Sequence, residues 1–483
     1  MRIIPICKTH TTKVTGLVFV LLLLTASAAF GQQARLQAKL DKLLLRKDVY
    51  PWKVSVLAVQ LNSGRTIFAS RETRPLMPAS NMKLVVTAAA LSHWGADHEF
   101  VTTLARRGKN LVLVGSGDPG FAEPGLLAKY NQNPTSVFRN WAAKVKQAGL
   151  SEVSDIIIDD TIFDRQFIHP NWPANQLKRW YTAPVGGLNL WENSILIKRR
   201  NLSSDGDLMM LVEPAVSYPS ASGQASDTQR QVWISGGPGA GPNYAGGVAS
   251  RAINKPIITT VSDPAVFFGS VFKAVLTEQS IPVRGQVVRR RVTDANGQLE
   301  SDLTVLARTS TKLTDIIDRA NKHSRSLFAE CLFKNLGAAP GQQGSWTSGA
   351  AAVREFLTSR AGARADQFVI DDGSGLSRRN LISPAALVAV LKYMHNRKEA
   401  EVFRNSLSIW GRDGTLRNRS SKSDLAGKLF AKTGYINGVY SLSGYIRTNR
   451  GNWIAFSILM NQATNGVRAR GLQEDICELL VDQ

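Results

Sequence analysis

The pattern of hydrophobic positions near the start of the chain predicts a strand pair followed by a helix. Residues 54–61 (VSVLAVQL) are rich in β-branched side chains, and an Asn-Ser-Gly turn joins them to a second apolar run at 65–70. The run over 81–94 is apolar almost throughout and ends at Gly95, which is typical of a buried helix with a glycine cap.

From about residue 99 to 260 the pattern changes to short apolar runs separated by turn-rich loops, with one helical stretch at 137–147. The short runs predict strands and include 111–114, 153–158 and 232–234. The loop 235–242 is rich in glycine and proline. It lacks the Gly-Lys-Ser/Thr ending of a phosphate-binding loop, so we interpret it as an ordinary loop.

Helical patterns return after Asp263-Pro264, a helix start with proline at its first position. The predicted helices cover 263–279, 313–336, 349–360 and 383–395. The chain then predicts a meander, with strands at 427–433, 439–447 and 453–460, a hairpin turn at Asn437-Gly438 and a last helix at 470–481. The α/β patterns at both ends therefore indicate one catalytic domain interrupted by a β-rich insertion.

The first thirty residues have the features of a secretory signal peptide. Arg2, Lys8 and Lys13 precede an apolar run at 14–24, and small residues follow it, so we place the cleavage after Gly31. An uncleaved anchor helix is the alternative, but the apolar run is shorter than the roughly 20 residues that a bilayer requires. The sequence therefore predicts an exported protein of the periplasm or cell-wall space.

Composition excludes several classes of protein. With 43% hydrophobic and 20% charged residues, the chain is neither disordered, nor collagen-like, nor a multi-pass membrane protein. The 59 Lys and Arg against 37 Asp and Glu give a net charge of +22. In an exported protein this surplus favours anionic groups of the cell wall or peripheral contact with lipid rather than nucleic acid.

Cysteine and histidine usage gives no sign of a metal site. The six histidines are scattered and form no zinc-binding motif, so we predict no metal and no cofactor. Two cysteines, Cys331 and Cys477, remain after removal of the signal peptide. We interpret them as buried apolar side chains, although a single disulfide between them stays open.

Candidate chemistry starts with Ser80 and Lys83, which are three residues apart at the start of the first predicted helix. This spacing places both side chains on one helix face. The apolar neighbours remove water from the amine, which lowers its pKa and lets it accept the serine proton. The alternative is a helix cap beside a surface lysine, and Ser-x-x-Lys alone is weak, since Ser270 and Lys273 also match it inside another predicted helix.

A second motif strengthens the first. Lys432-Thr433-Gly434 is the only Lys-Thr-Gly in the chain, and we place it at the end of the strand 427–433. Ser-x-x-Lys followed by Lys-Thr-Gly is typical of penicillin-interacting serine enzymes. The lysine of an edge strand can hold a substrate carboxylate while the strand backbone pairs with the peptide.

The chain resembles the class C low-molecular-mass penicillin-binding proteins, which are D-alanyl-D-alanine carboxypeptidases and endopeptidases. Besides both motifs, the resemblance is carried by 111–119 (LVLVGSGDP), 181–190 (YTAPVGGLNL), 372–377 (DGSGLS), 413–417 (DGTLR), 432–438 (KTGYING) and 443–445 (SGY). It implies a β-lactamase-like catalytic domain, with an antiparallel sheet and flanking helices, interrupted by accessory domains. The implied division is signal peptide 1–31, catalytic domain 32–98 and 263–483, and inserted region 99–262 with two nested β-rich domains.

The resemblance also implies roles for individual residues. Ser80 is the nucleophile, Lys83 the base, and Ser324 relays a proton to the leaving amine. Lys432, Thr433 and Gly434 bind the substrate, and β-lactams are expected as acylating inhibitors.

Two positions depart from the pattern of the family. The third motif, Ser-x-Asn, has Ser326 in place of its asparagine, and Tyr435 follows the Lys-Thr-Gly where a small hydroxyl residue is common. Losing one amide contact reduces the rate by roughly ten- to a hundredfold. Ser326 and Tyr435 are retained as substrate-binding positions, the latter through its backbone N–H.

The predicted function is a serine-type D-Ala-D-Ala carboxypeptidase or endopeptidase acting on peptidoglycan peptides. Two alternatives stay open: a peptidoglycan-binding protein on the same scaffold with weakened chemistry, and a related serine esterase or β-lactamase-like hydrolase. The oligomeric state is left open.

Overall fold

The computed structural model describes residues 31, 33–132, 135–201, 208–213, 233–235, 243–245, 257–419 and 422–483. The predicted signal peptide, except Gly31, and the glycine-rich loop from 236 to 242 lie outside these residues.

The first layer is a six-stranded antiparallel sheet built from both ends of the chain. Its order is β15-β16-β17-β18-β1-β2. The strands are β1 (Lys53–Gln60), β2 (Thr66–Ser70), β15 (Ser408–Ile409), β16 (Leu429–Ile436), β17 (Val439–Arg447) and β18 (Trp453–Asn461). The pairing of β1 with β18 runs from Lys53 opposite Asn461 to Gln60 opposite Ile454. The predicted hairpin and meander are therefore confirmed, and they share one sheet.

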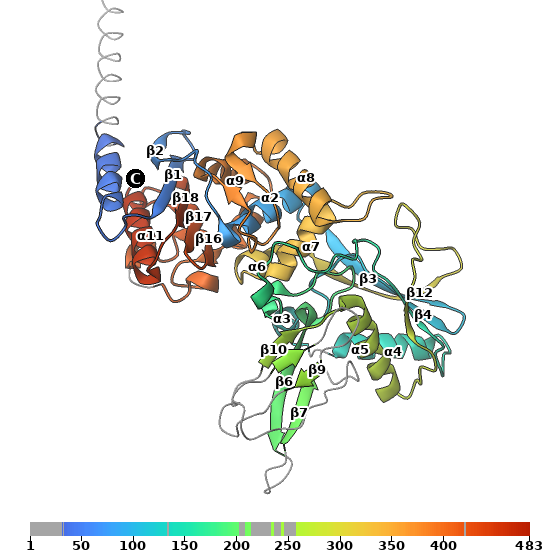
Figure 1. Ribbon diagram of the computed structural model, residues 1–483. Coiled ribbons are helices and arrows are strands. Elements are labelled where there is room, and N and C mark those ends of the chain that lie inside the picture. The colour runs from blue at the N-terminus through green and yellow to red at the C-terminus, as the bar shows by residue number, and fades with distance from the viewer. Residues whose placement is uncertain are drawn as a thin grey trace, which may run out of the picture.

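Helices cover both faces of this sheet, because its strands are apolar on both sides. A helix over 33–44 and α11 (Gly466–Val481) pack on one face and share a hydrophobic core with the strands. The other face is covered by α9 (Pro384–His395), with α2 (Met82–Trp94) packed behind it (Figure 1). The core on that face also contains α6 (Leu313–Asn321), α7 (Ser326–Leu336) and α8 (Trp346–Glu355), which continues into a π-helical turn at Phe356–Arg360, and also α10 (Ala400–Asn405).

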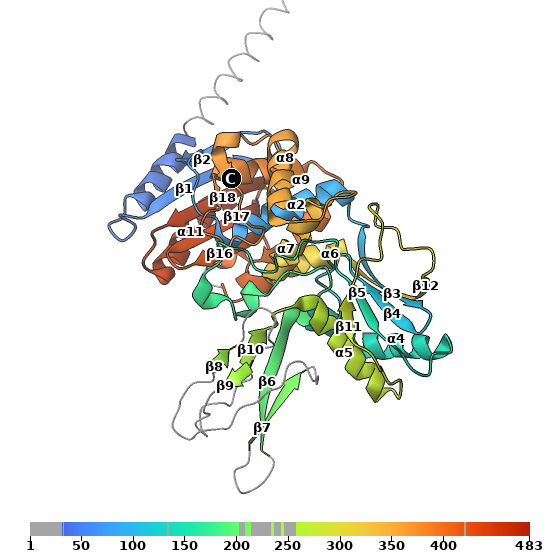
Figure 2. The same cartoon turned by 45° about the vertical axis from the view of Figure 1, so that its right-hand side comes forward.

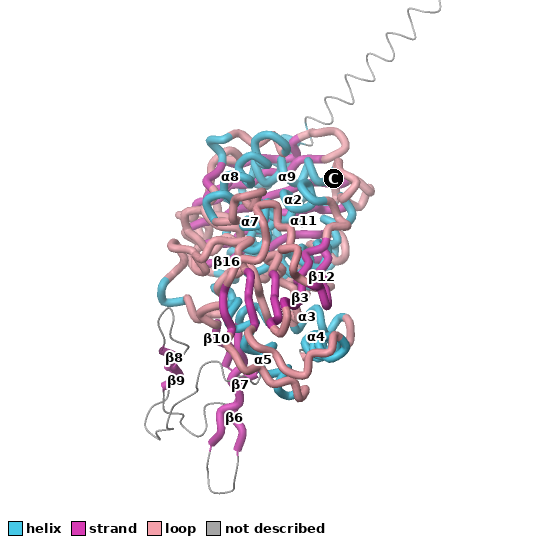
Figure 3. The backbone as a smooth tube through the Cα atoms, turned by 90° about the vertical axis from the view of Figure 1, so that its right-hand side faces the viewer, coloured by secondary structure: helices cyan, strands magenta, loops and turns pink. Residues whose placement is uncertain are grey.

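A second sheet forms the core of the inserted region. It has five strands in the order β11-β5-β4-β3-β12. These are β3 (Glu99–Arg107), β4 (Asn110–Val114), β5 (Ile156–Asp159), β11 (Val287–Arg289) and β12 (Thr304–Lys312). The helices α4 (Ser136–Gln147) and α5 (Pro264–Glu278) cover it through a cluster of aromatic side chains. Figure 3 shows β3 and β12 apart from the helices α2, α7, α8 and α9.

The pairing of β12 with β3 and of β11 with β5 bears on the predicted domain boundary at 263. Segments on both sides of that boundary build one sheet, and α5 shares its core. We therefore propose that the inserted region extends to Lys312. The division into domains remains a prediction.

Small sheets extend from this region. One contains β10 (Ile257–Thr260), β6 (Ser194–Asn201) and β7 (Leu208–Glu213), and the other pairs β8 (Trp233–Ser235) with β9 (Asn243–Ala245). Both lie away from the six-stranded sheet (Figure 2). Among the described residues, no helix has the length and apolar character needed to cross a bilayer.

The predicted helix over 313–336 is wrong in one respect. It consists of two helices, α6 (Leu313–Asn321) and α7 (Ser326–Leu336), and Ser324 between them has a left-handed backbone with φ of 57°. The apolar pattern continues across the break because both helices bury their apolar faces in the same core. The break places Ser324 on a loop between the two helices, where its hydroxyl can accept a hydrogen bond from Lys432.

The two cysteines are confirmed as buried apolar side chains. Cys331 and Cys477 are both free thiols, and they lie in different hydrophobic cores. No disulfide joins them.

Candidate active site

Ser80 lies in a single 3-10 turn, η1 (Ala79–Asn81), which leads directly into α2. The Lys83 Nζ lies 3.1 Å from the Ser80 Oγ, so the contact expected from their spacing is present. The same amine donates a hydrogen bond of 2.8 Å to the backbone carbonyl of Ser374. A nucleophile candidate and a base candidate are thus joined at the start of one helix.

Lys83 is fully buried, and this controls its chemistry. Every residue of α2 from Met82 to Leu91 is buried, because the helix is apolar all round and runs through the core. Burial lowers the pKa of Lys83 from 10.5 to about 8, while the negative charges of Glu330 and Asp372 act in the opposite direction. An amine with this pKa can be neutral near physiological pH and can take a proton from serine.

The Ser374 carbonyl is held in place by a tight loop, 372–377. Asp372 accepts hydrogen bonds of 2.7 Å from the backbone N–H of Gly375 and of Ser377. Gly375 has φ of 82°, and a Cβ there would overlap the carbonyl oxygen of Ala79. The loop therefore needs glycine to approach η1 closely enough for its carbonyl to reach Lys83.

Glu330 on α7 also holds the loop 372–377 in place by hydrogen bonds to its backbone. Its carboxylate accepts hydrogen bonds from the backbone N–H of Ser374 (2.8 Å) and of Gly373 (3.1 Å), and from the indole of Trp346 (2.8 Å). Burial, followed by the charge of Asp372, raises the pKa of Glu330 to about 7. Sequence reasoning missed this residue, although a single acid within an otherwise apolar stretch of helix was a usable signal.

Lys432, Thr433 and Gly434 lie on β16, opposite η1. We predicted that they end a strand, and this is wrong, because β16 continues to Ile436. A Cβ on Gly434 would lie 2.7 Å from the Pro78 carbonyl and 3.1 Å from the Ser80 nitrogen. Glycine therefore allows the strand backbone to pack directly against the residue that carries the nucleophile.

Lys432 joins the strand to the α6–α7 loop. Its Nζ donates to the Ser324 Oγ (2.9 Å) and to the Thr433 carbonyl (2.8 Å). Burial, and then the positive charge of Lys83, hold the pKa of Lys432 well below its usual value. An incoming carboxylate would favour the charged form of this amine, which suits it to bind an anionic chain end.

Asn81 ties these elements together. With its amide nitrogen facing the Lys432 carbonyl at 2.8 Å, its oxygen accepts from the Ser443 hydroxyl at 2.7 Å. Ser80, β16 and β17 are thereby linked side by side. Sequence reasoning did not identify Asn81.

The two departures from the family pattern have distinct surroundings. Ser326 is the first residue of α7 and is buried. The Tyr435 side chain is 63% exposed and packs against Tyr440. Its backbone lies beside the contact of Gly434 with Ser80.

The Thr433 hydroxyl donates a hydrogen bond of 2.8 Å to the Thr415 hydroxyl. The segment 413–417 therefore also lies at the site.

The second Ser-x-x-Lys match lies elsewhere. Ser270 and Lys273 are on α5 in the inserted region, and the Lys273 amine donates to the Gly285 carbonyl at 2.7 Å. Among the described residues, no three His, Cys, Asp or Glu side chains are grouped as a metal site.

Comparison with known proteins agrees with this geometry. The D-Ala-D-Ala carboxypeptidase 3 (S13) family matches residues 36–481, which is nearly all of the described chain. The chain belongs to the S13 family. The predicted resemblance to low-molecular-mass penicillin-binding proteins is thus confirmed, and so is the predicted class of enzyme, a serine-type D-Ala-D-Ala carboxypeptidase.

Individual relatives match most of the sequence. The chain is 30% identical to a D-alanyl-D-alanine carboxypeptidase from Actinomadura sp., covering 95% of this chain and 86% of the relative. It is 24% identical to the D-alanyl-D-alanine carboxypeptidase DacB of Haemophilus influenzae, covering 86% of both.

The crystal structure of penicillin-binding protein 4 from Haemophilus influenzae superposes with a TM-score of 0.74 at 22% identity. It covers 92% of this chain and 99% of that structure. This match confirms the predicted fold, a penicillin-binding catalytic domain interrupted by an insertion. The same protein has also been solved with a bound β-lactam, with a TM-score of 0.72.

Proposed function

We propose that this S13 protein hydrolyses the terminal D-Ala-D-Ala bond of peptidoglycan peptides through an acyl-enzyme on Ser80. The observation that carries the proposal is the fully buried Lys83 amine, 3.1 Å from the Ser80 hydroxyl. Burial makes the neutral amine accessible, and the hydrogen bond gives the proton a direct path.

In the acylation step the Ser80 Oγ loses its proton to the Lys83 Nζ and bonds to the carbonyl carbon between the two alanines. The backbone N–H groups of Ser80 and Tyr435 stabilise the oxyanion, for which the close packing of Gly434 on Ser80 is the support. The C–N bond then breaks as the Ser324 hydroxyl gives its proton to the departing amine, and Ser324 recovers a proton from its hydrogen-bonded partner Lys432.

Binding and deacylation use the same groups. The terminal carboxylate of the substrate lies against the Lys432 amine and the Thr433 hydroxyl, two donors on β16. After D-alanine leaves, Lys83 gives up the proton it took from Ser80 and Lys432 takes one up, so that Lys83 is neutral again. A water molecule then gives a proton to Lys83 and attacks the ester carbon. Lys83 passes this proton to the Ser80 Oγ as the ester C–O bond breaks, which releases the shortened peptide and regenerates Ser80. A β-lactam follows the same first step, but its amine stays attached to the acyl group, so the ester persists.

The direct test is labelling with a fluorescent penicillin, followed by mass spectrometry of the labelled peptide and by measurement of D-alanine release from a muropeptide. We expect label on Ser80 and loss of both activities in Ser80→Ala. Ser270→Ala, in the second Ser-x-x-Lys match, is the control and should keep both. Label on a residue other than Ser80, or D-alanine release by Ser80→Ala, would contradict the proposal.

We further propose that the protein acts outside the cytoplasm, on cell-wall peptides. The predicted signal peptide supports export, and the net charge of +22 supports attraction to an anionic wall. N-terminal sequencing of the mature protein should begin at Gln32. An N-terminus at Met1 in the exported fraction would instead favour an uncleaved anchor.

A further inference from the structure

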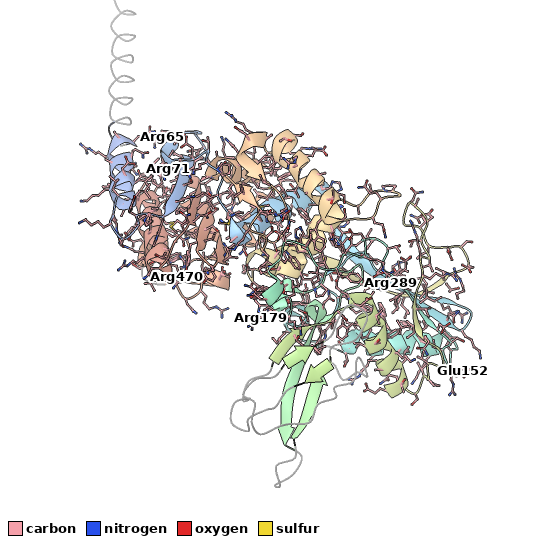
Figure 4. All side chains as sticks on the ribbon, in the orientation of Figure 1. Arg65, Arg71, Glu152, Arg179, Arg289 and Arg470 are labelled. Carbon is pink, nitrogen blue, oxygen red and sulfur yellow. The ribbon has the colours of Figure 1, made fainter. Side chains whose placement is uncertain are left out.

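The loop between α6 and α7 is where the inserted region meets the catalytic helices. Arg325 lies between Ser324 and Ser326, and its guanidinium Nη1 lies 3.3 Å from the Glu192 Oε2. The Arg325 guanidinium carbon, Cζ, also lies 4.8 Å from the ring centre of Trp180, which is a cation–π contact. Both partners belong to the inserted region, Glu192 in η4 (Trp191–Asn193) and Trp180 in η3 (Trp180–Thr182), and η3 packs against α7. Figure 4 shows Arg179, next to Trp180, where these two parts of the molecule meet.

A second arginine holds the other end of the loop. The Arg319 guanidinium, on α6, is hydrogen-bonded to the Glu123 carboxylate and lies 3.7 Å from the Glu192 Oε1. Glu123 also accepts a hydrogen bond from the backbone of Leu126 at the start of α3 (Pro124–Lys129). The Arg325 backbone N–H donates to the Arg319 carbonyl at 3.0 Å. Two carboxylates of the inserted region therefore hold the arginines on either side of Ser324.

Ser324 needs such support because its backbone is left-handed, a conformation that is unfavourable for a residue with a Cβ. Such a conformation persists only when surrounding contacts impose it. Its hydroxyl accepts a hydrogen bond from Lys432, so the direction of this hydroxyl depends on the backbone that carries it.

Glu192 is itself held rigidly toward the arginines. Trp191, Glu192 and Asn193 have left-handed φ values of 53°, 54° and 50°. The Asn193 amide fixes this turn by donating to the carbonyl of Pro184 and to the side chain of Asn189, both at 2.7 Å. A rare backbone turn with this much support is typical of a functional constraint.

We propose that Glu192 is a positioning residue that acts through Arg325 to hold Ser324 in the geometry that delivers a proton to the leaving amine. The inserted region then contributes to catalysis through Glu192. This inference rests on the proposed function, because it assigns Ser324 the proton-transfer step.

The charge state of Glu192 gives the arrangement a pH dependence. Arg325, Arg319 and Glu123 are the charged groups that face it. Burial raises the pKa of Glu192 to about 7, Glu123 adds to this effect, and both arginines oppose it. As the pH falls through 7, Glu192 takes up a proton, its ion pair with Arg325 is lost and the hold on Ser324 weakens.

The test measures kcat and KM for D-alanine release by wild type, Glu192→Gln, Arg325→Met and the double variant. Glu192→Gln should lower kcat about tenfold, as expected for one charge-assisted contact that shapes the reacting geometry, and leave KM nearly unchanged. The double variant should be no slower than the slower single variant, because the two residues act as a unit. Asp366→Asn, which breaks the exposed pair with Arg364, is the matched control and should not change kcat.

The pH profile separates positioning from a general loss of stability. The kcat of wild type should fall as the pH drops below about 7, because Glu192 takes up a proton there. The kcat of Glu192→Gln should fall less steeply over the same range, because the glutamine does not titrate. If Glu192→Gln does not fold, as judged by its melting temperature, Arg325→Lys replaces it. That variant keeps the charge but loses the planar stacking, so its kcat should lie between those of wild type and Arg325→Met.

The outcomes distinguish this inference from the proposed function. A wild-type protein that neither releases D-alanine nor is acylated at Ser80 would overturn both. An active wild type with unchanged kcat and pH profile in Glu192→Gln, or with Arg325→Met as active as wild type, would overturn the positioning role alone.

Discussion

The pH dependence of Ser80 acylation tests the central physical argument. Lys83 must be neutral to accept the serine proton, and it is neutral only above its pKa. Burial places that pKa at about 8 instead of 10.5. The rate of Ser80 acylation should therefore increase as the pH rises toward 8, and it should level off above that pH.

The structure also sets the size of the effect. At pH 7 a lysine with a pKa of about 8 is neutral in roughly one molecule in ten, whereas a lysine at the ordinary value is neutral in roughly one in three thousand. Burial thus increases the reactive fraction about three-hundredfold at pH 7. Below pH 7 the rate should change about tenfold for each pH unit, as a single titrating base requires.

The assay is the initial rate of labelling by a fluorescent penicillin across this pH range. Lys83→Arg is the informative variant, because a guanidinium keeps the positive charge but does not give up its proton. It should label at least about a hundredfold more slowly, the usual contribution of a general base. Lys273→Arg, in the other Ser-x-x-Lys match, is the control and should label as wild type does.

Two results would refute the reasoning. One is a labelling rate that does not vary between pH 6 and pH 8, or that rises only near the ordinary lysine value. The other is a Lys83→Arg variant that labels as fast as wild type, since the desolvated amine would then have no role as base.

Three further substitutions test the surroundings of the site. Gly375→Ala should lower the melting temperature and abolish labelling, because the new methyl group would overlap the Ala79 carbonyl at a left-handed position; normal labelling would contradict this. Thr433→Val removes the hydroxyl that bonds Thr415 and should raise KM for a D-Ala-D-Ala peptide about tenfold with a smaller change in kcat, and an unchanged KM would exclude carboxylate binding by this hydroxyl. Ser326→Asn restores the amide of the family motif and should speed acylation up to about tenfold in stopped-flow measurements, whereas slower acylation would show that the site has adapted to the serine.

Much of the fold could be predicted because its signals are local. The strand β17 begins and ends where its alternating and β-branched pattern does, and the hairpin at Asn437-Gly438 follows from the turn preference of that pair. The helix α5 starts at the predicted Asp263-Pro264 cap, whose carboxylate accepts a hydrogen bond from the third residue of the helix. These features depend on residues within a few positions of one another.

Other features escaped prediction because distant residues decide them. The break between α6 and α7 has no glycine or proline to mark it, and it coincides with ion pairs from Arg319 and Arg325 to carboxylates more than a hundred residues earlier in the chain. The pairing of β3 with β12 joins segments about two hundred residues apart, so no local pattern in the sequence could reveal it.

The sequence by itself determined which groups are available for chemistry. It carries a serine and a lysine one helical turn apart, a Lys-Thr-Gly strand and a serine at the third motif, and these spacings depend only on the covalent chain and on helix geometry. The tertiary structure alone decided what those groups can do. Only packing removes water from Lys83, brings the Ser374 carbonyl and Lys432 to the site, and holds Ser324 in its left-handed turn, because desolvation and charge interactions depend on neighbours that are distant in the sequence.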